Sequence, residues 1–107
     1  MYLEINRIKI KLIIAKSFYI RLKGFMFKKD INFALLFPRC NMIHTMFMKK
    51  NINIIGINKD NKIIFIRKNV SKNKLIKIKT HIKDTSIIEV PTFFNNFNLN
   101  DQVKIIY

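Results

Sequence analysis

The feature that most constrains the fold is a pair of isoleucine-rich runs, at residues 51–57 and 62–67, with the polar segment 58–61 between them. The β-branched side chain of isoleucine favours the extended backbone of a strand. Two such runs joined by a short polar loop are typical of a β-hairpin. Gly56 lies inside the first run, and a glycine within a strand indicates a β-bulge or a close approach of the backbone.

The rest of the chain also alternates apolar and polar residues, which predicts further strands. In residues 3–15 isoleucine and leucine alternate with lysine, and Asn6-Arg7 can break this segment into two strands. Further strands are expected at 32–37, 42–48, 75–83, 87–90 and 103–106, with a short helix at 17–23 and one helical turn at 92–98. We therefore predict a mainly β fold of the α+β class, in which a small curved sheet or β-barrel carries one or two short helices.

Asparagine is expected to shape the turns, because the chain has only two glycines and two prolines. Asparagine tolerates the left-handed backbone region better than other residues with a side chain. The candidates for left-handed positions are Asn41, Asn61, Asn73 and Asn100.

The chain is predicted to be a single domain spanning residues 1–107, because it has no linker and no internal repeat. Half of its residues are hydrophobic, which is enough for one packed core. No apolar run approaches the ~20 residues that span a bilayer, and the lysines near the N-terminus are unlike a secretory leader. The single cysteine excludes an intrachain disulfide and fits a reducing compartment, so we expect a cytoplasmic protein that does not span the membrane.

The formal net charge of +15 raises the hypothesis of a polyanionic partner. The 17 lysines, 22 isoleucines and 13 asparagines favour another origin, because an AT-rich genome overproduces these residues. Arginine, which binds phosphate in a bidentate manner, occurs only four times. If the strand faces merge into one stripe, the lysines available for weak, sequence-independent binding are Lys9, Lys11, Lys77, Lys79 and Lys83.

Five short motifs occur along the chain. Segments 21–28, 43–48, 52–58, 89–93 and 100–103 resemble, in turn, R-x-x-G-L-M-F-R, I-H-T-F-F-M, I-D-V-I-F-L-D, E-L-P-A-G and G-D-x-V. In this order they are similar to the bacterial and archaeal family called domain of unknown function 192, over about residues 15–103. The resemblance implies a small β-rich domain with no established activity. Asn53 and Asn58 replace acidic residues of the pattern, and Phe93 and Asn100 replace glycines.

The motif positions supply the candidate binding residues, which are Arg21, His44, Thr45, Met48, Asn53 and Glu89. Most matches are apolar or neutral, so the resemblance favours a non-catalytic binding or accessory domain. Its pocket or surface is expected around residues 43–58, for a small polar ligand or a protein partner. Two alternatives stay open: binding of nucleic acid or anionic surfaces by the lysine faces, and a small hydrolase or transferase using His44 and Glu89. Arg21 and Glu89 could instead form a structural salt bridge.

No motif argues for a cofactor, a metal or a catalytic residue. Two glycines leave no phosphate-cradling loop, and the H-E-x-x-H, C-x-x-C and G-x-S-x-G patterns do not occur. Cys40 and His44 would lie ~13 Å apart on a strand, too far to share one ion. His44 is more simply a hydrogen-bonded histidine beside the core. Met42, Met46 and Met48 are expected to be adaptable core residues.

Overall fold

Strands make up most of the regular structure in the computed structural model, which describes residues 1–15, 31–46 and 48–107. The strands are β1 (Tyr2–Ile5), β2 (Ile8–Ile14), β3 (Ala34–Phe37), β4 (Met42–His44), β5 (Ile52–Asn58), β6 (Ile63–Val70), β7 (Leu75–Lys77), β8 (Thr85–Pro91) and β9 (Lys104–Ile106). A 3-10 helix, η1, spans Ile82–Asp84. The mainly β prediction is confirmed. The helix predicted at 17–23 lies outside the described residues, as does Arg21.

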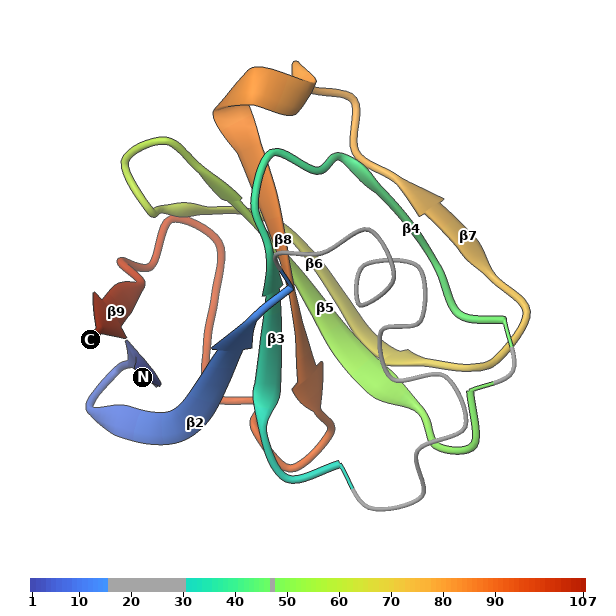
Figure 1. Cartoon of the computed structure of the whole chain (residues 1–107), viewed down its shortest axis with the longest axis horizontal. Coiled ribbons are helices and arrows are strands. Elements are labelled where there is room, and N and C mark those ends of the chain that lie inside the picture. The colour runs from blue at the N-terminus through green and yellow to red at the C-terminus, as the bar shows by residue number, and fades with distance from the viewer. Residues whose placement is uncertain (16–30, 47) are drawn as a thin grey trace.

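Seven strands form one sheet in the order β6-β5-β8-β3-β2-β1-β9, and β4 and β7 form a separate two-stranded sheet (Figure 1). In the larger sheet β2 and β3 pair in parallel, and the other neighbours are antiparallel. This sheet curls strongly into a half-barrel. The curl brings the start of β6 against the segment before β9, where Lys62 pairs with Gln102 and the Val103 N–H donates to the Asn61 carbonyl at 2.8 Å.

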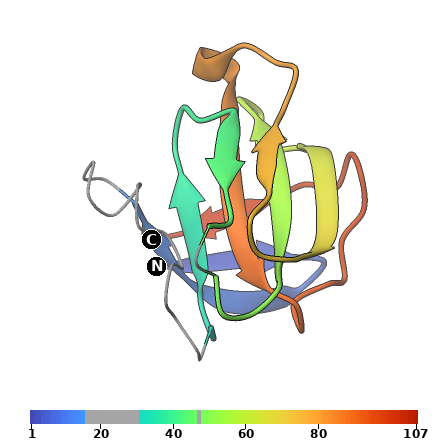
Figure 2. The same cartoon turned by 90° about the vertical axis from the view of Figure 1, so that its right-hand side faces the viewer.

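The central strands send alternate side chains to two hydrophobic clusters, one on each face of the sheet. In β8, Ile88 and Val90 join the inner cluster within the curl, whereas Ile87 joins the outer cluster on the opposite face. The inner cluster comprises Leu3, Ile5, Ile10, Leu12, Ala34, Leu36, Ile55, Ile57, Ile63, Ile88, Val90, Phe94, Phe97 and Val103. The outer cluster comprises Ala15, Ile31, Leu35, Phe37, Met48, Ile52, Ile54, Val70, Ile76, Ile78 and Ile87. Figure 2 shows β4 and β7 in front of β5 and β8, where they cover the outer cluster.

The predicted hairpin is confirmed as β5 and β6. Of the two alternatives expected at Gly56, a strand irregularity is present, and the atoms closest to the glycine belong to side chains and not to the backbone. The β5–β6 register shifts between Gly56 and Ile57, which marks an irregularity of the bulge type. A Cβ on Gly56 would lie 2.5 Å from Cδ1 of Ile78 and 3.0 Å from Cβ of Phe65. The absence of a side chain at this position therefore lets the segment after β7 pack directly on β5.

Two predicted strands are shorter than expected. The 42–48 strand ends at His44, because Thr45 turns to bond the backbone of residues 71–74. Met42 and Met46 are 50% and 48% exposed, so the prediction that they are core residues is wrong, whereas Met48 is buried as predicted. The 75–83 strand ends at Lys77.

Local side-chain hydrogen bonds replace the strand ladder after Thr80. The side chain of His81 accepts from the Lys83 N–H, and the hydroxyls of Thr80 and Thr85 lie 2.5 Å apart. These bonds compete with strand pairing and favour the 3-10 turn η1. Ile82, which lies in this turn, is therefore exposed.

The segment 92–98 forms a turn with no helix, so this prediction is also wrong. The turn is closed by the Phe94 N–H, which donates to the Pro91 carbonyl at 3.0 Å. The rings of Phe94 and Phe97 stack with centroids 6.2 Å apart and are buried in the inner cluster. The packing of these rings orders the segment without helical hydrogen bonds.

Left-handed turn positions are largely asparagines, as predicted. Asn61, Asn73 and Asn100 have positive φ, whereas Asn41 does not. Positive φ also occurs at Asn6, Arg7, Arg39 and Asn69. Asn6 and Arg7 form the tight turn that divides β1 from β2, which confirms the predicted break. No helix in the described part of the chain is long and apolar enough to cross a membrane.

Candidate functional site

Thr45, a predicted binding residue, is a buried anchor for the loop 71–74. Its hydroxyl donates to the Ser71 carbonyl at 2.7 Å and accepts from the Lys74 N–H at 2.8 Å. Its backbone N–H donates to the Lys74 carbonyl at 2.9 Å, and its carbonyl accepts from the Asn73 N–H at 3.1 Å. Thr45 therefore positions the loop that carries Lys72.

Asn53 has a similar role for two other segments. Its amide N–H donates to the Phe94 carbonyl at 3.1 Å, and its oxygen accepts from the Asn69 N–H at 2.8 Å. Asn69 has positive φ, so this bond holds an unusual turn of the backbone near the end of β6. An ionised aspartate could not donate to the Phe94 carbonyl. The amide in place of the family's acidic residue thus fits its surroundings in this chain.

The structure does not bring His44 and Glu89 together. His44 pairs with the exposed Leu75 on the outward face of the β4–β7 sheet, whereas Ile43 and Ile76 point to the outer cluster. The imidazole Nδ1 accepts from the Met46 N–H at 3.3 Å. Glu89 lies in β8, on the sheet that this layer covers. The two side chains therefore share no cleft that could support acid–base catalysis.

Glu89 is a fully buried carboxyl group in apolar surroundings. It is 1% exposed and pairs across the sheet with Leu35 on β3 and Ile54 on β5, both members of the outer cluster. Its Oε1 atom has no hydrogen-bond partner among the described residues. Burial away from water raises the pKa of Glu89 to about 8, because desolvation penalises the charged form. The carboxyl is therefore largely protonated at neutral pH.

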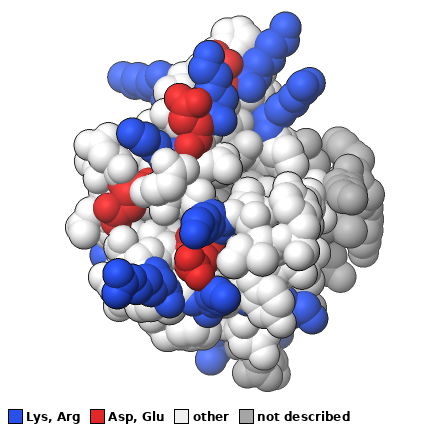
Figure 3. Space-filling view, turned by 90° about the vertical axis from the view of Figure 1, so that its left-hand side faces the viewer, with Lys and Arg blue, Asp and Glu red and all other residues white. Residues whose placement is uncertain are grey.

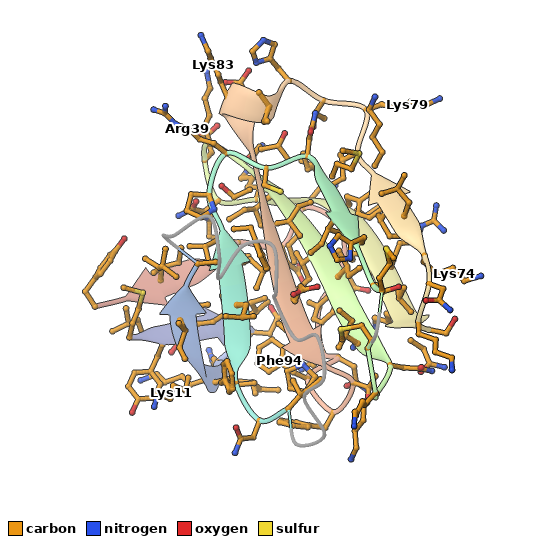
Figure 4. All side chains as sticks on the ribbon, turned by 45° about the vertical axis from the view of Figure 1, so that its right-hand side comes forward. Lys11, Arg39, Lys74, Lys79, Lys83 and Phe94 are labelled. Atoms are coloured by element: carbon orange, nitrogen blue, oxygen red, sulfur yellow. The ribbon has the colours of Figure 1, made fainter. Side chains whose placement is uncertain are left out.

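The lysines proposed for a polyanion stripe do not form one surface. Figure 4 shows Lys11 at the lower left and Lys79 and Lys83 at the upper end of the molecule. Lys9 lies 3.8 Å from the Glu4 carboxylate, which offsets its charge. On the face shown in Figure 3, basic and acidic side chains are interspersed.

A different group of lysines gathers where three strands end. In the sheet register Ile52, at the start of β5, pairs with Val70 at the end of β6 and with Pro91 at the end of β8. The residues flanking these positions therefore meet at the lower end of the molecule in Figure 1. Strand pairing thus assembles segments 48–51, 71–72 and 91–93, which are far apart in the sequence.

These segments line two adjoining hollows, which we call the end groove. The first, of about 610 Å³, is lined by Met48, Lys49, Lys50, Asn51, Ser71 and Lys72. The second, of about 500 Å³, is lined by Ile31, Asn32, Lys50, Asn51, Pro91, Thr92 and Phe93. Both are open and shallow, and they meet at Lys50 and Asn51.

The end groove carries positive charge, and none of the described residues that line it is acidic. The β5–β8 register pairs Asn58 with Thr85 at the opposite end of these strands, so Asp60 and Asp84 lie far from the groove. A seven-residue strand such as β5 spans roughly 20 Å. This separation exceeds the screening length in physiological salt.

The lysines of the end groove were missed by reasoning from strand faces, because they lie in loops. The available signals were Lys49-Lys50 directly before the hairpin and Ser71-Lys72 directly after it. The first residue of a hairpin pairs with its last residue, so the segments directly before and directly after the hairpin are neighbours in space. No group of three or more histidine, cysteine, aspartate or glutamate side chains within the described ranges could hold a metal ion.

Comparison with known proteins gives one family match and two similar folds. The model of the DUF192 family, described as "Uncharacterized ACR", matches residues 1–105. A protein of unknown function from Novosphingobium aromaticivorans DSM 12444 is 13% identical, with a TM-score of 0.85 over 98% of this chain and 84% of that chain. A protein from Sinorhizobium meliloti 1021, named "a putative transcription regulator", is 13% identical, with a TM-score of 0.77 over 96% of this chain and 89% of that chain. No curated protein matches the chain. At such identities the two solved structures establish a shared fold alone.

Proposed function

Because this chain belongs to the DUF192 family, which is described as uncharacterised, we propose a function from its own surface: a non-catalytic binding domain that holds anionic ligands in the end groove. The observation that carries the proposal is the convergence of Lys49, Lys50 and Lys72 on adjoining hollows with no acidic residue among the described lining residues.

The physical basis is electrostatic attraction in an open, shallow site. Three exposed ammonium groups that face one hollow repel each other, and an anion between them relieves that repulsion. Exposed charges are screened by salt, so binding should weaken as ionic strength rises. Lysine suits this role as a point charge that does not require a fixed phosphate geometry.

Among the predicted binding residues, Met48 lines the first hollow, whereas Thr45 and Asn53 support the groove from behind. Thr45 anchors the loop that carries Lys72, and Asn53 bonds the segment around Phe94 and the end of β6. This arrangement favours binding over catalysis, because Thr45 and Asn53 are occupied by backbone hydrogen bonds and His44 and Glu89 share no cleft. We further propose a cytoplasmic location, which the single cysteine supports.

The test compares two triple variants that remove the same number of lysines. Wild-type protein should bind a heparin oligosaccharide in low salt, with a log Kd that rises linearly with log salt. K49Q/K50Q/K72Q should lose most of this affinity and flatten the salt dependence, whereas K77Q/K79Q/K83Q should change it little. All six lysines are exposed, so both variants should fold.

Two results would overturn the proposal. If K49Q/K50Q/K72Q binds heparin like the wild type, the end groove is not the anion site. If K77Q/K79Q/K83Q loses the affinity instead, the lysines of β7 and η1 form the binding surface. Circular dichroism of both variants verifies that any loss of binding is not a loss of folding.

A further inference from the structure

We infer that the anionic ligand of the end groove is single-stranded nucleic acid, with a base stacked on Phe93 and phosphates held by Lys49, Lys50 and Lys72. This inference rests on the proposed function and adds the ligand class. It depends on one aromatic side chain that the fold leaves in solvent beside the lysines.

Phe93 differs from the other two aromatic residues of its segment. Phe94 and Phe97 are 4% and 2% exposed and pack together in the inner cluster, whereas Phe93 is 67% exposed. Figure 4 places Phe94 at the lower end of β8. The turn that the Phe94 N–H closes on the Pro91 carbonyl buries Phe94 and leaves the neighbouring Phe93 outside. An exposed phenyl ring costs free energy in water, so a ligand that covers it is favoured.

Phe93 and the lysines belong to one continuous surface. Phe93 lines the second hollow, Lys49 and Lys72 line the first, and Lys50 borders both. A strand of nucleic acid that crosses the boundary would therefore meet an aromatic ring on one side and ammonium groups on the other. Stacking platforms beside a positively charged groove are the usual way in which proteins bind single strands without sequence preference.

Other polyanions fit this surface less well. In a duplex the bases are stacked within the helix and cannot cover Phe93. Heparin and acidic peptides can meet the lysines but offer no nucleobase for the ring. An anionic membrane would also attract the lysines, but the polar Asn32, Asn51 and Thr92 that line the second hollow oppose insertion into lipid. Asn32 and Thr92 could instead bond base edges.

Phe93 also stands at a position where the motif that this segment resembles, E-L-P-A-G, has a glycine. A glycine there would offer no ring for a base to stack on.

A single-tryptophan variant reports stacking directly. The chain contains no tryptophan, so F93W places its only indole at the proposed contact. Titration with an oligothymidylate of about eight nucleotides, within the range bound by comparable sites, should quench the indole fluorescence. An abasic oligonucleotide of equal length should bind through its phosphates and quench far less. Unchanged fluorescence at saturation with oligothymidylate would overturn the inference.

A second variant separates stacking from charge. F93A should weaken oligothymidylate binding about 5-fold to 150-fold, as measured for the loss of base–aromatic stacking, and leave heparin affinity unchanged. Tyr107 is 89% exposed at the C-terminus, so Y107A is the matched aromatic control and should bind like the wild type.

The outcomes distinguish the inference from the proposed function. If K49Q/K50Q/K72Q loses affinity for both heparin and oligothymidylate while F93A binds oligothymidylate like the wild type, the proposed anion binding by the groove stands and base stacking on Phe93 is rejected. Retention of heparin binding in the triple variant would reject the groove itself. Binding to phosphatidylserine vesicles that F93A abolishes, without any affinity for oligothymidylate, would identify a membrane surface and overturn the nucleic-acid assignment.

Discussion

At the scale of single residues, Thr45 and Asn53 show how polar side chains of the motifs bond the backbone of distant segments. Thr45 is the strongest case within the described ranges, since its hydroxyl both donates and accepts a hydrogen bond with the loop 71–74. Removing this hydroxyl leaves the Ser71 carbonyl and the Lys74 N–H without their hydrogen-bond partner. The loss in the free energy of unfolding should therefore exceed the net contribution of the two hydrogen bonds.

Replacement of Thr45 by valine, which has the same shape, should lower the free energy of unfolding by about 1–3 kcal/mol. T45S keeps the hydroxyl and should lose less of the free energy of unfolding, which makes it the control. Urea denaturation measures the free energy of unfolding of both variants. T45V should also weaken heparin binding, because the loop that carries Lys72 is no longer held. Equal stability of T45V and T45S would mean that the hydroxyl bonds contribute little.

Glu89 gives stability an unusual dependence on pH. Its pKa is about 8 in the folded protein against 4.5 for a free side chain, so the folded state keeps the proton more tightly. The contribution of this group to stability is therefore complete below about pH 4.5, decreases as the pH rises and levels off above about pH 8. The decrease is at most about 5 kcal/mol.

The variant E89Q cannot titrate and should lose this decrease. We expect E89Q to match the wild type near pH 5 and to be the more stable protein at pH 9. The partly exposed Glu4 provides the control, since E4Q should retain the wild-type pH profile. Urea denaturation across this range of pH is the measurement. A wild-type stability that rises from pH 5 to pH 9 would contradict the assignment of Glu89.

At the scale of elements, the β5–β6 hairpin depends on the missing side chain at Gly56. In G56A the new Cβ would meet Cδ1 of Ile78 at 2.5 Å and Cβ of Phe65 at 3.0 Å. Overpacking of this kind costs about 1–3 kcal/mol. The variant I78V removes the nearer atom, so G56A/I78V should be more stable than the sum of the single effects implies. Thermal denaturation of the four proteins gives the coupling, and strict additivity would refute the steric explanation.

The elements that could be predicted were those whose own sequence decides their structure. The hairpin followed from two isoleucine-rich runs, and the break at Asn6-Arg7 from two polar residues inside an alternating segment. The segments 42–48 and 75–83 could not be predicted fully, because Thr45 and Thr80 find hydrogen-bond partners outside the local pattern. The strands themselves end at His44 and Lys77, although the alternation of buried and exposed residues continues to Ile78 and Lys79.

At the scale of the whole molecule, the end groove shows why the candidate site could be predicted only in part. The motifs placed a binding surface around residues 43–58, and four of the lining residues, Met48–Asn51, fall within that range. Ser71, Lys72 and Phe93 enter through strand register, which no local pattern contains. The family followed from five motifs in order, and the match over residues 1–105 confirms it.

The net charge of +15 also acts on the whole fold. Like charges on a small domain repel each other and lower its stability, and salt screens this repulsion. Raising sodium chloride from about 0.05 M to about 0.5 M should therefore raise the Tm by a few degrees. K77Q/K79Q/K83Q, with three fewer charges, should respond less. A Tm that falls with salt would indicate that attractive ion pairs dominate instead.

Strand β8 belongs to both hydrophobic clusters, since Ile87 faces one and Ile88 and Val90 face the other. It also pairs with β3 on one side and β5 on the other. We therefore expect the parts of the fold built on the inner cluster and on the outer cluster to unfold together. Amide hydrogens of β8 should exchange with deuterium only through complete unfolding, with a protection free energy equal to that from denaturant titration. Earlier exchange at these amides would reveal two independently opening units.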